Sequence, residues 1–149
     1  MPSLTSVEQP LKCLLVDDDA DDRLFFEMAV GRAIPAMLCM TESDSTRAML
    51  LLENDATFNP SMIFLDLNMP VLDGRECLRR IRQVGRLAHT PVYIFSTSNN
   101  GKEVQVARML GSSGYIVKPN SFDKLVEALM GVMESKGSDE FYLFGEISG

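Results

Sequence analysis

The residues most able to do chemistry stand at the ends of short apolar runs. In chain order they are Asp17, Asp18 and Asp19, then Asp66, then Ser96 and Thr97, and last Lys118. Carboxylates crowded at one place repel each other unless a cation lies among them. Mg²⁺ prefers such oxygen ligands, whereas a chain with one histidine and no CxxC pair offers little to softer metals. A carboxylate can also attack phosphorus, and Mg²⁺, a lysine and a hydroxyl would stabilise the resulting aspartyl phosphate.

Each of these features also has an ordinary structural explanation. An acidic string such as DDDADD commonly opens a solvated helix, because aspartates favour the positive end of the helix dipole. Asp66 before NMP is typical of a turn, Ser96 of a helix cap or loop hydroxyl, and Lys118 of a surface lysine. The combination is what indicates a site, because four separate strand ends each supply a different component of it.

Five short, continuous apolar runs alternate with helical patterns along the chain. The runs cover residues 11–16, 36–40, 61–65, 91–95 and 114–117. Continuous rather than alternating hydrophobicity is typical of parallel strands that are covered on both faces. We therefore expect five buried parallel strands.

Helical spacing of apolar residues appears between and after these runs. A stripe of Ala20, Leu24, Phe25, Met28 and Ala29 follows the first run. Further helices are expected over residues 45–54, 73–84 and 101–110, and the cleanest stripe runs from residue 122 to 133. We interpret Met28, Met49 and Met130 as parts of the core.

Strand followed by helix, repeated about five times, predicts an open α/β fold with a doubly wound parallel sheet. In such sheets ligands bind at the carboxyl ends of the strands. All the polar residues named above would project to that edge. The tail from Gly137 changes composition, and its run of apolar residues is compatible with disorder, folding back or docking on a partner.

Bulk properties exclude several classes of protein. The 149 residues suit one domain, and a formal net charge of −7 argues against direct nucleic-acid binding. Three widely spaced cysteines suggest neither a disulfide framework nor a zinc site, and they fit a reducing compartment. No secretory signal and no apolar run long enough for a bilayer is evident. We expect a cytoplasmic protein without membrane contact.

Four segments in order resemble the signature segments of response-regulator receiver domains. They are LLVDDD at 14–19, FLDLNMPVLDG at 64–74, VYIFSTS at 92–98 and SGYIVKP at 113–119. The resemblance implies a flavodoxin-like sheet of five parallel strands in the order 2-1-3-4-5, with five helices. It places a receiver domain at residues 11–136, between an N-terminal extension, 1–10, and a C-terminal tail, 137–149.

The resemblance also implies roles for single residues. Asp66 matches the phosphoacceptor, and Asp17 and Asp18 match the acidic pair that holds Mg²⁺ together with Asp66 and the backbone carbonyl of Asn68. Ser96 matches the switch hydroxyl, Lys118 the phosphate-binding lysine, and Tyr115 the aromatic residue that rotates in the switch. Thr97 would narrow access to the acyl phosphate, Asn68 and Ser98 would tune its hydrolysis, and Pro119 would follow a cis peptide.

The implied mechanism is phosphoryl transfer to Asp66 from a histidine kinase or a histidine phosphotransfer protein. Ser96 would then move towards the phosphate, Tyr115 would turn inward, and the face of the fourth helix, fifth strand and fifth helix would change its affinity for a downstream protein. Long loops at residues 54–60 and 85–90 resemble stand-alone receivers that partner hybrid or phytochrome-type kinases, and a homodimer through the aromatic tail would fit that group. No DNA-binding output domain is expected after residue 135.

Two other functions remain open at this point. One is a haloacid-dehalogenase-like phosphatase with Asp17 as nucleophile and Asp19 completing a DxD motif, although the later acidic pair of that family is missing after Lys118. The other is a receiver-like binding module that is never phosphorylated.

Overall fold

The computed structural model describes residues 10–149, so the predicted extension 1–10 lies outside it except for Pro10. The sheet has six strands, β1 (Lys12–Val16), β2 (Leu38–Glu42), β3 (Met62–Leu65), β4 (Val92–Ser96), β5 (Gly114–Val117) and β6 (Tyr142–Phe144). The helices are α1 (Ala20–Ala33), α2 (Ser45–Asn54), α3 (Gly74–Gln83), α4 (Gly101–Met109) and α5 (Phe122–Ser135), with a 3₁₀ turn, η1 (Gly85–Leu87).

Every neighbouring pair of strands is parallel, and the order is β2-β1-β3-β4-β5-β6. The predicted α/β class, the five helices and the order of the first five strands are confirmed. The predicted count of five strands is wrong, because the tail folds back and adds β6 beside β5.

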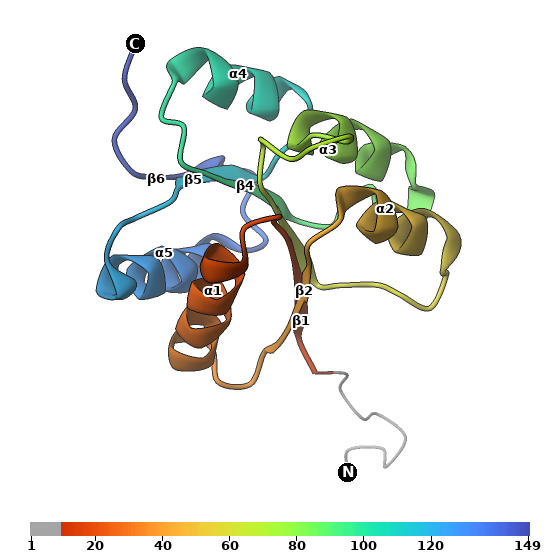
Figure 1. Cartoon of the computed structure of the whole chain (residues 1–149), viewed down its shortest axis with the longest axis horizontal. Coiled ribbons are helices and arrows are strands. Elements are labelled where there is room, and N and C mark those ends of the chain that lie inside the picture. The colour runs from red at the N-terminus through yellow and green to blue at the C-terminus, as the bar shows by residue number, and fades with distance from the viewer. Residues whose placement is uncertain (1–9) are drawn as a thin grey trace.

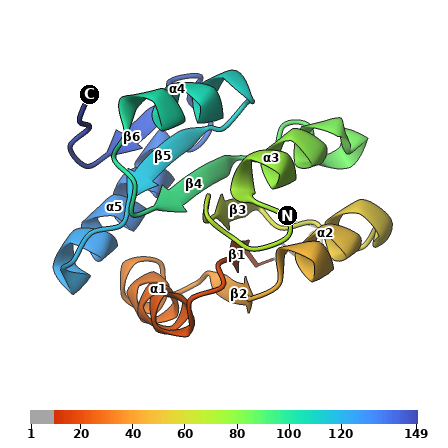
Figure 2. The same cartoon turned by 45° about the horizontal axis from the view of Figure 1, so that its top comes forward.

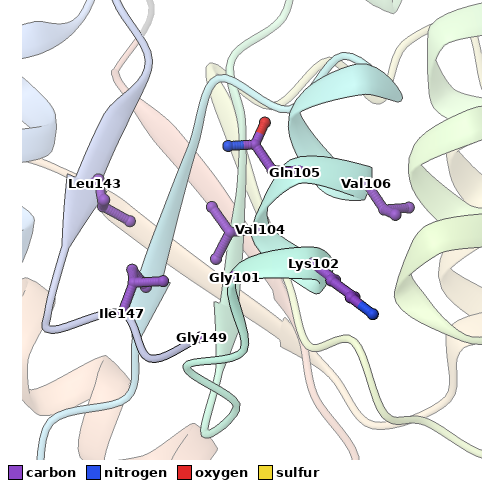
Figure 3. A pocket seen from close by; sticks show the side chains of 8 residues that line it. All are labelled: Gly101, Lys102, Val104, Gln105, Val106, Leu143, Ile147 and Gly149. Atoms are coloured by element: carbon purple, nitrogen blue, oxygen red, sulfur yellow. The ribbon is translucent and has the colours of Figure 1, made fainter.

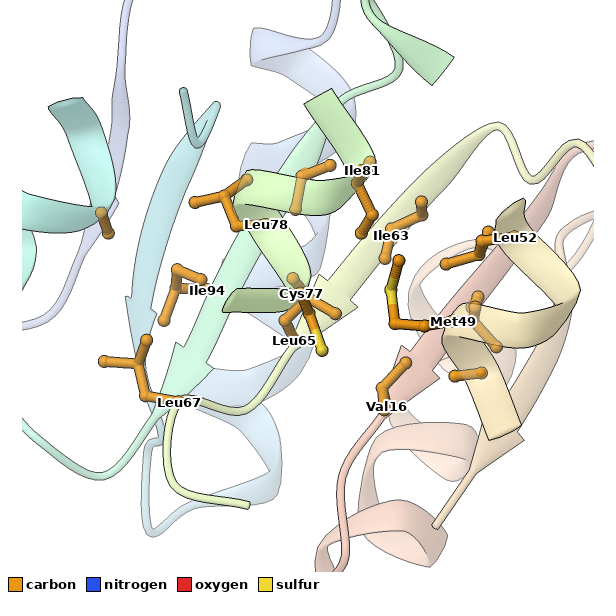
Figure 4. Packing of buried hydrophobic residues seen from close by; sticks show 14 of the residues in the cluster. Val16, Met49, Leu52, Ile63, Leu65, Leu67, Cys77, Leu78, Ile81 and Ile94 are labelled. Carbon is orange, nitrogen blue, oxygen red and sulfur yellow. The ribbon is translucent and has the colours of Figure 1, made fainter. Parts of the chain in front are cut away.

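The sheet lies between two layers of helices. Helices α1 and α5 cover one face, and α2, α3 and α4 cover the other (Figures 1 and 2). Successive strand residues point to opposite faces, so each strand contributes to both cores. Figure 4 shows the core between the sheet and helices α2, α3 and α4, where Ile63 and Leu65 pack against Met49, Leu78 and Ile81.

The core on the other face gathers Leu15, Phe64 and Phe95 with residues of α1 and α5. These helix residues include Phe26, Ala29, Leu125 and Leu129.

The apolar stripe predicted for the first helix marks its buried side only in part, since Ala29 is buried. Leu24 and Met28 are 58% and 56% exposed, and Met130 of α5 is 49% exposed. The interpretation of Met28 and Met130 as core residues is therefore wrong, whereas Met49 is buried as predicted. The buried residues of α1 are Phe26, Ala29 and Val30.

The tail is anchored to the sheet and to α5. Tyr142 pairs with Gly114 in the register of β5 and β6, and its hydroxyl donates to Ala128 O at 2.9 Å. A Cβ atom on Gly114 would lie 2.4 Å from Tyr142 O. This close approach requires glycine at residue 114 and explains how a strand of three residues holds its place.

Two further expectations concern the whole backbone. In residues 10–149 no peptide bond is cis, so the cis peptide expected before Pro119 is wrong. Among these residues no helix has the length and apolar character needed to cross a membrane.

Candidate functional site

The polar residues singled out from the sequence meet at the carboxyl edge of the sheet. Asp17 directly follows β1, Asp66 follows β3, Lys118 follows β5, and Ser96 is the last residue of β4. Parallel pairing in register brings these strand ends together, since Val16 lies beside Leu65 and Ser96 beside Val117. The backbone N–H of Asp66 donates to Val16 O at 3.0 Å, and that of Lys118 donates to Ser96 O at 2.7 Å.

Three carboxylates form one cluster at this edge. Asp17, Asp18 and Asp66 each offer an oxygen, and these atoms lie within 4.8 Å of one another. Asp17 is fully buried: its Oδ1 accepts from the backbone N–H of Asp19 at 3.0 Å, and its Oδ2 lies 2.8 Å from Lys118 Nζ but has no other polar partner. Carboxylate oxygens from three residues gathered this closely suit a hard cation. The cluster therefore fits Mg²⁺, with Asp17, Asp18 and Asp66 as ligands.

The Asp66 carboxyl group lies in surroundings that disfavour its charged form. The residue is only 6% exposed; its Oδ1 accepts from the backbone N–H of Asn68 at 3.4 Å, and its Oδ2 lies 3.6 Å from Lys118 Nζ. Burial raises the pKa of Asp66 to about 6 against the attraction of Lys118, and the nearby charges of Asp17 and Asp18 add to the rise. A cation beside this carboxylate would favour its charged, nucleophilic form.

Lys118 faces three carboxylates at once. Its Nζ lies 2.7 Å from Asp22 Oδ2, 2.8 Å from Asp17 Oδ2 and 3.6 Å from Asp66 Oδ2, and it also lies 5.3 Å from the centre of the Phe95 ring. Burial lowers the pKa of Lys118, but hydrogen bonds with Asp17 and Asp22 outweigh burial and hold the pKa above its ordinary value. The ammonium is therefore charged at neutral pH.

The predicted switch residues form a connected chain after β4. Ser96 is fully buried, and its Oγ accepts from the backbone N–H of Ser98 at 3.1 Å. Tyr115 is also fully buried, and its hydroxyl donates to Ser98 O at 2.8 Å. Tyr115 thus lies inward in this structure. Thr97 and Asn68 are exposed beside the site.

Two residues at the site were not singled out from the sequence. Asp22 lies in the acidic string that opens α1, where nothing in the sequence distinguishes it from Asp21. Gly74 begins α3, and a Cβ there would lie 2.2 Å from Asp66 O, so only glycine lets α3 approach the backbone of Asp66. The DG pair at 73–74 is the signal that marks it. Asp19 caps α1, since its side chain accepts from the backbone N–H of Asp22 at 2.9 Å.

The loop between β3 and α3 contains a backbone outlier. Val71 has a φ of 66° and is 98% exposed. A β-branched residue is strained in this left-handed region. The strain lies in the loop that leads from Asp66 to α3.

Comparisons with known proteins agree with this geometry. Residues 13–130 match the family model of the response regulator receiver domain. The response regulator Rcp1 of Synechocystis sp. PCC 6803 is 33% identical over 128 residues, which are 83% of this chain and 86% of Rcp1. The nitrate/nitrite response regulator NarL of Escherichia coli K12 is 29% identical over 83% of this chain, but only 55% of NarL is covered.

Solved structures show the same likeness. The phosphorylated cyanobacterial phytochrome response regulator RcpA superposes with a TM-score of 0.76 at 29% identity, over 89% of this chain and 97% of RcpA. The Mn²⁺-bound form of Rcp1 superposes with a TM-score of 0.73 at 29% identity, over 85% of this chain and 94% of that one. The chain therefore belongs to the family of response regulator receiver domains, signalling proteins that partner histidine kinases and bind Mg²⁺ at an acidic site.

Proposed function

We propose that Asp66 is the phosphoacceptor of this receiver. A carboxylate oxygen of Asp66 attacks the phosphorus of a phosphohistidine, the P–N bond breaks, and the departing imidazole takes a proton from solvent. The phosphohistidine belongs to a histidine kinase or a histidine phosphotransfer protein, and a cytoplasmic location is part of the proposal. The observation that carries it is the meeting of Asp66 with Asp17, Asp18 and Lys118 at one edge of the sheet.

The residues around Asp66 have separate parts in this reaction. Asp17, Asp18, Asp66 and the backbone carbonyl of Asn68 would hold Mg²⁺, which neutralises charge on the phosphoryl group when bound. Lys118 supplies a positive charge 3.6 Å from Asp66 Oδ2. Burial keeps bulk water from much of the site. Water therefore screens the interactions between these charges less than it does at the surface.

Hydrolysis of the acyl phosphate would be intrinsic and tuned by residues at the open side of the site. Thr97 and Asn68 are exposed there, and Ser98 is half-buried. These roles stay predictions, because each depends on the path of the attacking water.

Phosphorylation would be read out through the loop after β4. Ser96 would move towards the phosphoryl group and pull on Ser98, whose carbonyl already accepts from Tyr115. The buried position of Tyr115 is the inward one, and its hydrogen bond to Ser98 O would couple it to the movement of Ser96. The next residue, Asn99, accepts from the backbone N–H of Ser148 at 2.9 Å, and Gly101 donates back to Ser148 O at 3.0 Å.

The readout face consists of α4, β6 and α5 rather than α4, β5 and α5, because β6 covers the edge of β5. A groove of about 670 Å³ lies between α4 and the tail, where Val104 points towards Leu143 and Ile147 (Figure 3). Met109, at the end of α4, is 85% exposed. We expect a downstream protein to bind this apolar face, and a homodimer through the outer edge of β6 is the second candidate for the same surface.

Phosphorylation with acetyl phosphate and Mg²⁺ tests the proposal directly. Intact-mass spectrometry should detect one added phosphoryl group on the wild type and on Asp19→Asn, because asparagine caps a helix as well as aspartate does. The Asp66→Asn variant should gain none. Loss of the label in Asp17→Asn with full retention in Asp66→Asn would instead support the phosphatase mechanism, and no label on any protein would support the binding module.

A further inference from the structure

Lys118 has a carboxylate partner that belongs to neither the phosphoacceptor nor the metal cluster. The contact of its Nζ with Asp22 Oδ2, at 2.7 Å, is its shortest contact with a carboxylate, 0.9 Å less than the 3.6 Å to Asp66 Oδ2. The Lys118 side chain is 9% exposed, whereas that of Asp22 is 37% exposed. Lys118 is therefore held towards the start of α1 and away from Asp66.

The fold fixes the position of Asp22. It lies in the first turn of α1, where its backbone N–H donates to the capping side chain of Asp19 at 2.9 Å. The next residue, Arg23, donates from its guanidinium to Asp17 O at 2.9 Å, so the helix start is tied to the end of β1. Two hydrogen bonds between a side chain and the backbone thus hold the start of α1 where the Asp22 carboxylate contacts Lys118.

We propose that Asp22 is a positioning residue that restrains Lys118 and competes with a phosphoryl group on Asp66 for its ammonium. This inference rests on the proposed function of Asp66 and Lys118. A phosphoryl group would draw Lys118 across the gap to Asp66, and the ion pair with Asp22 opposes that movement. The negative charge of Asp22 also disfavours added negative charge nearby. Both effects weaken phosphoryl binding, so Asp22 tunes how fully Lys118 responds to phosphorylation.

The proposal predicts that removing the charge of Asp22 strengthens the binding of a phosphoryl analogue. Replacing Asp22 by asparagine keeps the size of the side chain but removes its charge, which frees Lys118 for the phosphoryl site. We expect the affinity for beryllofluoride at saturating Mg²⁺ to rise roughly two- to fivefold, the range of a partly exposed ion pair. Isothermal titration calorimetry of the full chain measures this affinity.

Asp21→Asn is the matched control. Asp21 lies on the same turn of α1, is exposed, and loses the same charge at the same end of the helix dipole. A general effect of net charge or of helix stability would appear equally in both variants. Asp22→Glu provides the second test, because it restores a carboxylate near Lys118 and should return the affinity towards that of the wild type.

Three results separate this inference from the function on which it rests. A wild type that binds no beryllofluoride refutes the proposed function and the inference together. A wild type that binds it, with Asp22→Asn equal to or weaker than Asp21→Asn, refutes only the restraint. Failure of Asp22→Glu to reverse the gain of Asp22→Asn would also refute it, because the carboxylate would then not be the cause.

Discussion

Replacing Asp66 by asparagine should stabilise the metal-free protein at neutral pH. Burial raises the pKa of Asp66 from 3.8 to about 6, Lys118 offsets part of that rise, and Asp17 adds to it. The folded protein therefore binds a proton at Asp66 more tightly than the unfolded chain does. Above the folded-state pKa the wild type must keep a charge in a place that disfavours it, whereas the asparagine of the variant carries no charge at any pH.

The sign of the pH dependence follows from this raised pKa. A carboxyl group with a raised folded-state pKa contributes stability that is fully present below its unfolded pKa, and this contribution is lost as the pH rises through the folded value. The pKa is 3.8 in the unfolded chain and about 6 in the folded protein. This difference means that about 3 kcal/mol of the contribution is lost by neutral pH. About 1 kcal/mol of this loss falls between about pH 5 and about pH 7.

Urea unfolding followed by circular dichroism, with a chelator present, measures this effect. The free energy of unfolding of Asp66→Asn minus that of the wild type should grow by about 1 kcal/mol from about pH 5 to about pH 7. The exposed carboxylate of Asp21 provides a control, and Asp21→Asn should show a much smaller change. A difference that stays constant or shrinks as the pH rises would refute the reasoning. Added Mg²⁺ should stabilise the wild type more than Asp66→Asn, because it removes the charge conflict in the wild type alone.

Three other substitutions test the frame around the site. Gly114→Ala would place a Cβ atom 2.4 Å from Tyr142 O, so hydrogen exchange of residues 142–144 should become fast while that of β4 stays slow. Tyr142→Phe removes the hydrogen bond to Ala128 O and should lower the free energy of unfolding in urea by about 1 kcal/mol. Val71→Asn should raise it by about 1 kcal/mol, because asparagine tolerates positive φ better than valine.

The order of the first five strands was implied by the family resemblance, and β2, at the edge of the sheet, is mostly half-buried. The presence of the strands followed from the sequence, because β1, β3, β4 and β5 are buried almost throughout. Their continuous apolar runs stand out from the helical spacing between them, and parallel strands joined by helices leave few topologies. β6 was not predicted because a strand of three residues has no usable period. Its place depends on contacts far along the chain, with Gly114 and with Ala128, which no local pattern reveals.

The buried side of α1 could not be identified from spacing alone. Phe25 and Phe26 are adjacent, so two different stripes fit the same apolar residues. The stripe through Leu24 and Met28 is exposed, and the stripe through Phe26 and Val30 packs on β3 and β4. The Phe26 ring packs against the ring of Phe64, with 4.9 Å between their centroids. This contact, between residues far apart in the sequence, places the Phe26 side of α1 against the sheet.

The site was easier to predict than the helix faces because its geometry follows from topology. Side chains after parallel strands meet at one edge whatever the details of packing, so Asp17, Asp66 and Lys118 had to lie close together. Asp22 is different, because it stands on a helix, and its side chain reaches Lys118 only through the angle at which α1 leaves β1. No spacing rule distinguishes Asp22 from Asp21, so only the structure reveals it.

The charges at this edge explain why one site can both hold a cation and respond to a phosphoryl group. In this structure Lys118 contacts Asp17, Asp22 and Asp66, and its contact with Asp66 is the longest of the three. The carboxylate proposed as the nucleophile is therefore the one of the three that lies farthest from Lys118, and burial is the main cause that raises its pKa. A divalent cation bound by Asp17 and Asp66 would compensate both and leave Lys118 paired mainly with Asp22. Lys118 would then stay paired with Asp22 until a phosphoryl group adds negative charge at Asp66. Its movement towards Asp66 would therefore depend on phosphorylation rather than on metal binding.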